Sequence, residues 1–372
     1  MADNRLVVVG ASFAGLACAK AAAARGVRTT VLDLRPDAGS GIRTTGILVK
    51  EAADLLDVPI RLVKKLSSVR LYSPSLRSID LRRPGYSFLA TDTPNLLRWW
   101  AREAERQGVE IRWRTPLHSA ERLANGHMRL HPHNLRCRFL VGADGSLSTV
   151  ARALGLSANI RFLAGVEAEC HGIDGLANDR LHVFLDSIEA RGYIGWVVPG
   201  IGVAQIGLAR RLPHRPDLDR FIGRLATVCE TRNLEIEGYR SGLIPVGGPL
   251  RKVSDRSALL IGDAAGWVSP LTAGGIHCAL QWGRLAGIAI AEHLMDGGPD
   301  PGSVMARHVP SFRTKLALRR ILDLGPPNRL LDSILTCAPM KRFAQLVFFH
   351  HRGLLSRTSW AEWSELRRST NA

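Results

Sequence analysis

The chain has 372 residues, 46% of them hydrophobic and 22% charged, with a mean hydropathy of +0.02, which excludes a disordered, collagen-like or low-complexity protein and suits two interlocked domains. The net charge of +17 is compatible with a nucleic acid, an anionic membrane or another polyanion as partner. Because most basic residues are arginines spread along the chain, without runs or interleaved aromatic residues, we expect no nucleic-acid groove.

The first forty residues predict a dinucleotide-binding unit. Leu6–Val9 is a β-branched run that predicts a strand buried on both faces, and it leads into the Gly-rich turn Gly10–Gly15. We expect a helix over residues 16–25 and then a second strand, Thr29–Leu32, that ends at Asp33. Strand, Gly-rich turn, helix, strand and acid in this order are typical of a dinucleotide-binding βαβ unit.

Each part of this unit has a physical task. Gly10 allows the sharp turn out of the strand, Gly15 allows the helix to pack closely on the sheet, and N–H groups at the helix start meet the pyrophosphate. Ser12 occupies the usual middle-glycine position, where its hydroxyl is able to donate to a phosphate, and Asp33 would accept hydrogen bonds from ribose hydroxyls. We therefore expect dinucleotide contacts from Gly10, Ser12, Phe13, Ala14, Gly15 and Asp33.

Two later segments repeat the pattern of a short strand that ends in Gly and Asp. They are Phe139–Gly145, which contains Asp144, and Leu259–Gly266, which contains Asp263. Pro270–Ile276 then opens a long helix. In this order and at these separations, the three elements resemble the FAD-binding flavoprotein superfamily that includes aromatic hydroxylases, halogenases, lycopene cyclases and geranylgeranyl reductases.

This resemblance implies FAD as the cofactor and gives roles to the later motifs. In that superfamily the element matched by Asp263 contacts the ribityl chain, and the helix start matched by Ala273–Gly275 faces the pyrimidine edge of the flavin. The positive end of a helix would stabilise the negative charge that gathers there when flavin is reduced. The cofactor contacts implied are Arg43, Thr45, Asp144, Gly262, Asp263, Pro270, Ala273, Gly274, Gly275 and Ile276.

The helix-opening motif also favours one branch of the superfamily. Hydroxylases usually carry His after Gly-Asp-Ala-Ala, whereas Gly266 follows here, and Pro270–Ile276 is similar to the Pro-x-Thr-Gly-Gly-Gly-Ile pattern of geranylgeranyl reductases. The chain departs from those reductases at Gly41–Gly46, where Thr44 stands in place of the cysteine of Lys-x-Cys-x-Gly. Thr44 is therefore a candidate pocket residue, and chemistry that relies on a thiol is in doubt.

A second sheet is predicted in the middle of the chain. Between residues 158 and 249, short alternating runs predict an antiparallel sheet that roofs the flavin, with strands over 181–185, 193–198 and 203–208. Trp196 and Pro199 resemble the aromatic-x-Trp-x-aliphatic-Pro signature of halogenases and geranylgeranyl reductases, and Tyr193 lies one residue from its aromatic position. A one-residue step reverses the face of a strand. Trp196 and Tyr193 are candidate pocket-wall residues, with ordinary sheet packing as the alternative for both.

The predicted fold is therefore α/β: a Rossmann-like FAD-binding domain with an inserted antiparallel-sheet substrate domain and a C-terminal helical segment. The FAD-binding domain would be discontinuous. The predicted boundaries are 1–157 and 250–300 for the FAD-binding domain, 158–249 for the substrate domain, with part of 60–92, and 301–372 for the C-terminal helical region.

The C-terminal region is basic and helical in pattern. Residues 303–372 hold twelve basic and four acidic residues, with apolar stripes at helical spacing. We expect the apolar faces to pack on the cofactor domain. Alternatively, this basic region, with Trp360 and Trp363 near its end, lies on an anionic membrane and collects a lipid substrate.

Cysteine usage and hydropathy bear on the compartment. The six cysteines form no C-x-x-C pair and have no His partner at zinc spacing, so we expect no metal site and buried, reduced thiols in a cytoplasmic protein. No apolar run reaches the length of a membrane-spanning helix. Any membrane contact would therefore be peripheral.

These features predict an FAD-dependent oxidoreductase of the geranylgeranyl reductase type that reduces carbon–carbon double bonds of an isoprenoid or another lipid-like apolar substrate. The reductant would be NAD(P)H or another electron carrier, and the sequence does not distinguish the two because it has no second dinucleotide fingerprint. No side chain stands out as the proton donor, although His277 lies just after the Gly-Gly turn. The alternatives are a flavin-dependent monooxygenase or halogenase acting on a hydrophobic or aromatic small molecule, and a flavoprotein whose FAD is structural or sensory.

Overall fold

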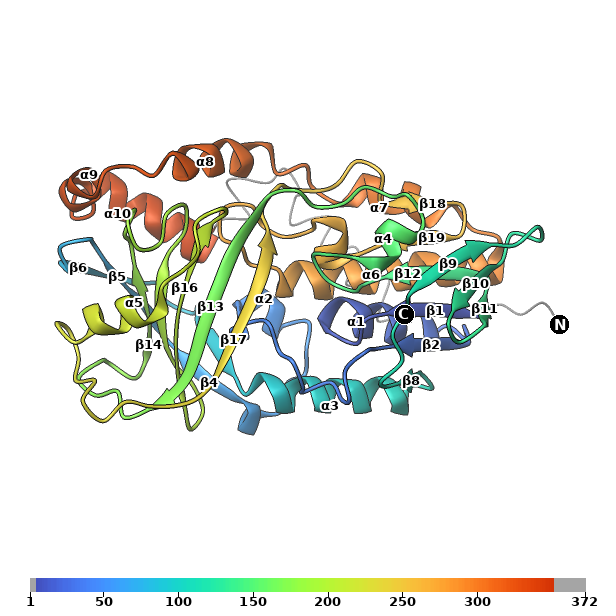
Figure 1. Ribbon diagram of the computed structural model, residues 1–372, viewed down its shortest axis with the longest axis horizontal. Helices are drawn as coiled ribbons and strands as arrows, with labels where there is room; N and C mark the ends of the chain where they lie inside the picture. Colours follow the sequence, from blue (N-terminus) through green and yellow to red (C-terminus); the bar gives the residue numbers. More distant parts are fainter. Residues whose placement is uncertain (1–4, 351–372) are drawn as a thin grey trace.

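Two large β-sheets, toward opposite ends of the long axis of the molecule, frame the fold (Figure 1). The computed structural model describes residues 5–350 of the chain. One sheet has six strands in the order β18-β19-β12-β1-β2-β8, and the other has seven in the order β17-β13-β16-β15-β14-β5-β6. This arrangement of a largely parallel and a largely antiparallel sheet confirms the predicted α/β class.

The six-stranded sheet is the Rossmann-like half. Its strands are β1 (Leu6–Val9), β2 (Thr29–Leu32), β8 (Glu110–Arg112), β12 (Phe139–Gly142), β18 (Ser254–Asp255) and β19 (Ala258–Leu260). All neighbours run parallel except the edge pair β18 and β19. Strand β1 lies between β12 and β2, and every residue of these three strands is buried, which accounts for their near-continuous apolar runs.

Three long helices share the core with this sheet: α1 (Phe13–Ala23), α3 (Thr93–Arg106) and α6 (Ile276–Asp296). Helices α1 and α6 pack closely because Gly283 and Gly287 carry no side chain. A Cβ at Gly287 would lie 2.2 Å from the carbonyl oxygen of Cys18. The predicted start of the first helix at residue 16 is wrong, because the N-cap is Ser12 and the helix begins at Phe13, within the Gly-rich segment Gly10–Gly15.

Two small sheets and several short helices lie beside the two large sheets, and β4 and β7 pack in the same core as the seven-stranded sheet. Their bounds are β3 (Ile47–Leu48), β4 (Val63–Leu66), β7 (Phe88–Thr91), β9 (Ser119–Arg122), β10 (Met128–His131), β11 (Leu135–Cys137), α2 (Lys50–Ala53), α4 (Thr149–Ala153) and the 3₁₀ turns Ile60–Leu62 and Gly262–Ala265. The Gly-rich turns after β1, β12 and β19 all follow the carboxyl ends of parallel strands. This edge is where open α/β sheets bind their ligands.

The seven-stranded sheet is mostly antiparallel. Its strands are β5 (Ser68–Tyr72), β6 (Ser78–Arg82), β13 (Phe162–His171), β14 (Arg180–Phe184), β15 (Gly195–Pro199), β16 (Ala204–Arg211) and β17 (Glu235–Pro245), and α5 (Leu218–Leu225) follows β16. The pair β14 and β5 runs parallel. The two longest strands, β13 and β17, are not among the three that the sequence predicts. Neither has the clean alternation of burial along its length that a period-two pattern requires.

Strands β5 and β6 bring residues 68–82 into a sheet otherwise built from residues 162–245. This topology supports including part of residues 60–92 with the second sheet. The division of the chain into domains remains a proposal.

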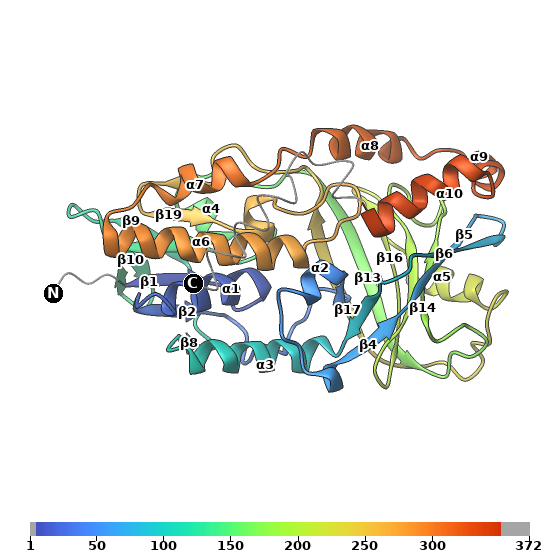
Figure 2. The same cartoon turned by 180° about the vertical axis from the view of Figure 1, so that it is seen from behind.

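The C-terminal helices lie along one edge of the molecule (Figure 2). They are α7 (Pro301–His308), α8 (Arg313–Leu324), α9 (Asn328–Ile334) and α10 (Ala338–Gln345), followed by a π-helical turn, Leu346–His350. Trp360 and Trp363, which the membrane hypothesis invoked, lie outside the described residues.

The inward face of α8 is not the apolar stripe that the sequence predicts. Lys315 and Arg319 are each only 3% exposed, whereas Ile321 of the predicted stripe is 58% exposed and Leu316 is partly buried against the core of the Rossmann-like half. The Arg319 guanidinium donates to the carbonyl oxygen of Gly192 and to the carboxylate of Asp323. A buried guanidinium therefore anchors this helix, because it reaches the Gly192 carbonyl beneath the helix while Asp323, one turn further along α8, pairs with its charge.

All six cysteines are free thiols. Four are buried, as expected, but Cys278 is half-buried and Cys337 is exposed, because Cys337 sits at the N-cap of α10 on the surface. Within residues 5–350, every helix is too short or too polar to cross a bilayer. In the same part of the chain, no three His, Cys, Asp or Glu side chains gather as a metal site would require.

Candidate functional site

A cavity of about 1620 Å³ is lined from both large sheets. Since a pocket for a drug-sized ligand measures roughly 300–1,000 Å³, this one has room for a dinucleotide and a second ligand. The predicted site residues that line it are Gly10, Ser12, Phe13, Ala14, Asp33, Arg43, Thr44, Thr45, Asp144, Tyr193, Trp196, Asp263, Ala273, Gly274, Gly275 and Ile276. Gly15, Gly262 and Pro270 are not among the lining residues.

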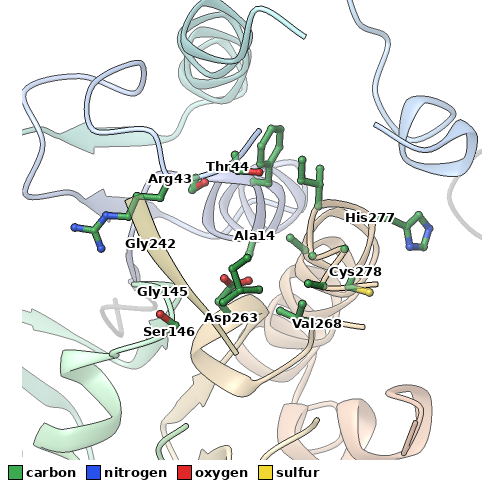
Figure 3. Close-up of a pocket in the computed structure, with 18 of the residues that line it drawn as sticks. Ala14, Arg43, Thr44, Gly145, Ser146, Gly242, Asp263, Val268, His277 and Cys278 are labelled. Atoms are coloured by element: carbon green, nitrogen blue, oxygen red, sulfur yellow. The ribbon is translucent and has the colours of Figure 1, made fainter. Parts of the chain in front are cut away.

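The lining comes from segments that are far apart in the sequence. Figure 3 shows Ala14, Thr44, Ser146 and Asp263 around this cavity, from α1, the loop 41–46, the turn after β12 and the 3₁₀ turn after β19. The turns that follow parallel strands thus meet the seven-stranded sheet at one place.

Close backbone contacts fix the first Gly-rich turn. Gly10 has a φ of +107°, and a Cβ there would lie 2.3 Å from the carbonyl oxygen of Ala143. A Cβ at Gly15 would lie 1.8 Å from the carbonyl oxygen of Gly10. Gly15 therefore acts by allowing α1 to pack against the turn and not by facing the cavity.

The start of α1 opens onto the cavity. Ser12 is its N-cap, but the Ser12 side chain makes no capping hydrogen bond, and Phe13 and Ala14 of the first turn line the cavity. The N–H groups of a first turn have no acceptor within the helix, and they favour an anion. The turn therefore offers main-chain donors, and the Ser12 hydroxyl beside them, to a phosphate.

Asp33 is held by Arg35, a residue that the sequence analysis did not identify. Asp33 Oδ2 accepts from the Ala11 N–H at 2.7 Å and from Arg35 Nη2 at 2.8 Å, and Oδ1 accepts from Arg35 Nε at 2.9 Å. Burial acts to raise the pKa of Asp33, but the hydrogen bonds and charge of Arg35 outweigh burial and lower it. The acid is therefore ionised, and Arg35 lines the same end of the cavity. The position of Arg35 two residues after the acid is its sequence signal.

Asp144 serves the chain itself. Its Oδ1 accepts from the Ser148 hydroxyl at 2.6 Å, and its Oδ2 accepts from the N–H groups of Thr149 and Val150 at 2.7 and 3.1 Å. Burial raises the pKa of Asp144, and these bonds partly offset the rise. The carboxylate caps α4, which favours a structural role for a residue that the resemblance presents as a cofactor contact.

Asp263 differs from the other two acids. Among the described residues, no hydrogen bond or ion pair reaches its carboxylate, and burial raises the pKa of Asp263 to about 6. The side chain lies in the cavity, with Gly275 beside it: a Cβ at Gly275 would lie 3.3 Å from Asp263 Oδ1. A half-buried carboxylate that faces the cavity without donors is a site for the hydroxyl groups of a ligand.

The loop before α6 is held tightly. Ala273 has a φ of +49°, a conformation that favours glycine, and its N–H donates to the Ser269 carbonyl at 2.9 Å. The Tyr193 hydroxyl donates to the Thr272 carbonyl at 2.6 Å. Because α6 begins at Ile276 without a side-chain cap, its positive end also opens toward the cavity.

The second part of the cavity is an apolar chamber beneath the seven-stranded sheet. Tyr193 precedes strand β15 and is not part of it, so the expected reversal of face does not apply. The rings of Tyr193 and Trp196 meet edge to face with centroids 6.4 Å apart. Other apolar lining residues of this chamber are Phe88, Leu181, Val183, Ile194, Val347 and Phe348. Contact of Tyr193 or Trp196 with a substrate remains a prediction.

A buried acid on β13, Glu167, also lines the cavity and was missed by the sequence analysis. Glu167 is 4% exposed, and its Oε2 accepts from the Thr45 hydroxyl and from Trp196 Nε1 at 2.8 Å. Burial raises the pKa of Glu167. An acid inside a run of apolar residues is the only sequence signal for it.

These features fit FAD. The glycine-bounded turn and the start of α1 would take the pyrophosphate, Asp33 lies where an adenosine ribose would need an acceptor, and Asp263 offers an acceptor to the ribityl hydroxyls. The start of α6 would face the flavin. These assignments of individual contacts remain proposals.

Two family models match the chain: an NAD(P)-binding Rossmann-like domain over residues 8–71 and an FAD binding domain over residues 61–192. The first match covers the dinucleotide turn, and the second covers strands of the seven-stranded sheet from β5 to β14. The Gly-rich turns after β1, β12 and β19 and the start of α1 form what we call the cofactor cradle. Together with this cradle, the two matches make FAD the cofactor of this site.

The chain is similar to curated archaeal proteins named digeranylgeranylglycerophospholipid reductase 2. It is 27% identical to the protein of Methanosphaera stadtmanae over 316 residues, with 80% of each chain covered. It is also 27% identical to that of Methanothermobacter thermautotrophicus over 357 residues, with 89% of this chain and 90% of the relative covered.

Solved structures share the fold at lower identity. A geranylgeranyl bacteriochlorophyll reductase-like protein from Thermoplasma acidophilum superposes with a TM-score of 0.79 at 20% identity, covering 94% of this chain and 96% of that protein. A flavin-dependent brominase superposes with a TM-score of 0.69 at 15% identity, covering 92% of this chain and 94% of that one. These structures establish the fold, which reductases and halogenating enzymes both use.

Proposed function

The chain is a geranylgeranyl reductase-like, FAD-dependent oxidoreductase, and from that premise we propose that it reduces carbon–carbon double bonds of an isoprenoid or another lipid-like apolar molecule. The observation that carries the proposal is the apolar chamber that continues from the cofactor cradle in one cavity. The names of the archaeal relatives support an isoprenoid lipid as the substrate class.

The chamber is suited to a long apolar chain. Its walls are aromatic and aliphatic side chains, including Trp196 and Phe348, and burying such a chain against them gains about 25 cal/mol per Å² of apolar surface removed from water. Its roof is the seven-stranded sheet. The chamber therefore binds the substrate and excludes water from the reacting carbons.

FAD, when bound, supplies a hydride to the double bond. The protein orients the two partners: Trp196 and Tyr193 form one wall, and the hydrogen bond from Tyr193 to Thr272 ties that wall to the loop before α6. The positive end of α6 would stabilise negative charge at the edge of the cofactor.

A diffusing reductant completes the cycle in this proposal, and it is NAD(P)H or another electron carrier. The absence of a second dinucleotide fingerprint in the sequence favours transient contact with the donor over a dedicated site. Anaerobic reduction of the bound FAD by NADH, NADPH and a reduced ferredoxin, each followed by absorbance, would identify it.

The substrate is tested with enzyme reduced anaerobically by light and then mixed with a geranylgeranyl lipid or with oxygen. The proposal expects rapid reoxidation by the lipid and a mass gain of two hydrogens for each double bond reduced. Slow reaction with every isoprenoid, together with oxygenation or halogenation of an aromatic compound in air, would support the alternative of a monooxygenase or halogenase. That alternative rests on the fold, which a brominase shares.

We also propose that the C-terminal helices contact an anionic membrane. Leu324, Leu330 and Phe343 are exposed, and the exposed basic residues Arg320 and Arg329 accompany them. Exposed apolar residues among basic ones are typical of helices that lie on anionic lipid. Sedimentation with phosphatidylglycerol vesicles tests this, with phosphatidylcholine vesicles as the control. Failure to sediment with the phosphatidylglycerol vesicles would refute the proposal.

A further inference from the structure

The strongest unassigned group in the cavity is the carboxyl of Glu167, in the middle of strand β13. This carboxyl is buried between Thr45 and Trp196, two residues of the cavity wall that both donate to its Oε2. Its other oxygen, Oε1, is closed to solvent and accepts no hydrogen bond within residues 5–350. An ionised carboxylate in this position would leave half of its acceptors without donors.

The charges around Glu167 favour its neutral form. Arg240 of β17 is the nearby cation, and its Nη1 lies 3.6 Å from Glu167 Oε1. The hydrogen bonds of that guanidinium go instead to the carboxylate of Glu169 and to the carbonyl oxygen of Thr44. Arg43, on the same loop as Thr45, forms no hydrogen bond or ion pair with Glu167.

Two carboxyl groups therefore share one guanidinium. The cluster is neutral when one carboxyl keeps a proton, and Glu167 is the more buried of the two and the farther from Arg240. Burial is the main cause that raises the pKa of Glu167, and the negative charge of Glu169 adds to it, while Thr45, Trp196 and Arg240 oppose it. Glu167 is thus the carboxyl of this pair that keeps a proton, and it lies in the wall of the cavity.

The hydrogen bonds also define how that proton leaves. The indole N–H of Trp196 is a donor only, so it cannot receive a proton from Glu167. The hydroxyl of Thr45 lies 2.5 Å from Oε2 on a residue that lines the cavity. Because a hydroxyl both donates and accepts, it donates to Oε2 when the carboxyl is ionised and accepts from Oε2–H when Oε2 carries the proton. Thr45 is therefore the exit from the carboxyl to a bound ligand.

We propose that Glu167 is the proton source for double-bond reduction and that the Thr45 hydroxyl passes the proton to the substrate; this rests on the proposed function. Reduction breaks the π bond and forms two C–H bonds. The hydride for one comes from reduced FAD, which is thereby oxidised by two electrons. The proton for the other leaves the Thr45 hydroxyl as that hydroxyl takes the proton of Glu167, and the resulting carboxylate is reprotonated from water after the product leaves.

The proton itself is tested without cofactor or turnover. In FAD-free protein at neutral pH, infrared spectra should contain the carbonyl stretch of a protonated carboxyl that shifts in D₂O. Glu167→Gln, which keeps the shape and an acceptor oxygen, should remove intensity from this band. Glu121→Gln should not, because Glu121 is an exposed partner of Arg129 on β9. An unchanged band in Glu167→Gln overturns the proposal.

The transfer is tested with pre-reduced, FAD-loaded enzyme and a geranylgeranyl lipid. Since general acid catalysis contributes roughly 10²–10⁴-fold, Glu167→Gln and Thr45→Val should slow lipid reduction by that factor. Thr45→Ser, which restores the hydroxyl, should recover the rate lost in Thr45→Val.

The pH profile separates proton supply from a structural role. The wild-type rate should be highest where Glu167 is protonated and should fall as pH rises through its pKa, and the Glu167→Gln profile should lack this limb. A wild-type rate and profile in Glu167→Gln overturn the inference. A Glu167-dependent infrared band without reduction of any isoprenoid overturns the proposed function and leaves the protonation of Glu167 intact.

Discussion

The cofactor cradle and the apolar chamber belong to one cavity but are built in different ways. The cradle consists of main-chain groups at the ends of β1, β12 and β19, spaced by glycines that a side chain would disrupt. The chamber consists of side chains such as Trp196, Tyr193 and Phe348, which come from distant segments. Binding a pyrophosphate requires a backbone shape, so its requirements are local in sequence, whereas binding an apolar chain requires only surface, which many combinations of residues supply.

The comparison predicts that the cradle tolerates substitution less than the chamber. Gly10→Ala should destabilise the protein by about 5 kcal/mol or prevent folding, because it combines a φ of +107° with a Cβ 2.3 Å from the Ala143 carbonyl oxygen. Gly26→Ala is the matched control: it has a φ of +82° but no atom within 4 Å, and should cost about 1–2 kcal/mol. Urea unfolding and FAD content measure both, and equal losses would contradict the role of the contact.

In the chamber, Trp196→Phe should keep most of the apolar wall. The variant removes the indole donor to Glu167 Oε2, so the free energy of unfolding should fall by about 1–3 kcal/mol. FAD content should not change, whereas KM for a long isoprenoid should rise. Loss of FAD from this variant would mean that the chamber and the cradle are not separable.

Titration of Asp263 should make both the stability of the FAD-free protein and its affinity for FAD depend on pH. Its pKa of about 6 in the FAD-free protein lies above the ordinary value of 3.8, so the native state holds more protons than the unfolded chain between these values. By linkage, its contribution to the stability of the FAD-free protein decreases as pH rises through this window. FAD affinity should show the opposite trend and rise as the carboxylate forms.

Asp263→Asn should therefore weaken FAD binding by about 1–3 kcal/mol at pH 8 and remove the dependence near pH 6, while raising the thermal stability of the FAD-free protein. Fluorescence titration with FAD at several pH values, and unfolding scans without it, measure the two effects. Equal affinity in the variant and the wild type would refute the proposed ribityl contact.

The smallest effect is expected at the junction of the two regions. Ala273→Gly should stabilise the protein by about 0.5–1 kcal/mol, because relief of the left-handed conformation exceeds the added entropy of glycine in the unfolded chain. Thermal unfolding measures the gain. Destabilisation would show instead that the Ala273 methyl group, which packs at the edge of the chamber, matters more than its backbone.

The local features of the cradle could be predicted from the sequence, whereas the roles of its acids could not. Strands β1 and β2 and the turns with Gly10, Asp144 and Asp263 were predicted because strand burial and tight turns leave local patterns. The roles of the acids were not local. Asp144 and Asp263 follow strands in similar motifs, yet one carboxylate caps α4 and the other, in the cavity, has no donor among residues 5–350.

The second sheet was predicted less completely. Strand β17 is exposed along much of its length and alternates in exposure only over residues 237–242, so its pairing with β13 identifies it as a strand where the sequence pattern does not. The inward face of α8 was predicted wrongly, because the acceptors for Arg319 lie more than a hundred residues away at Gly192 as well as on the helix itself. Periodicity identifies a helix but does not identify what lies beneath it.

By itself, then, the sequence determined the cradle for FAD, since turns that bring a backbone to a pyrophosphate demand particular residues at fixed spacing. The tertiary structure decided which carboxyl groups remain available inside the cavity. Asp33 is paired with Arg35 and Glu167 is shut in with Thr45 and Trp196, because hydrogen bonding and burial depend on neighbours that the fold brings together from residues as far apart as 45 and 196.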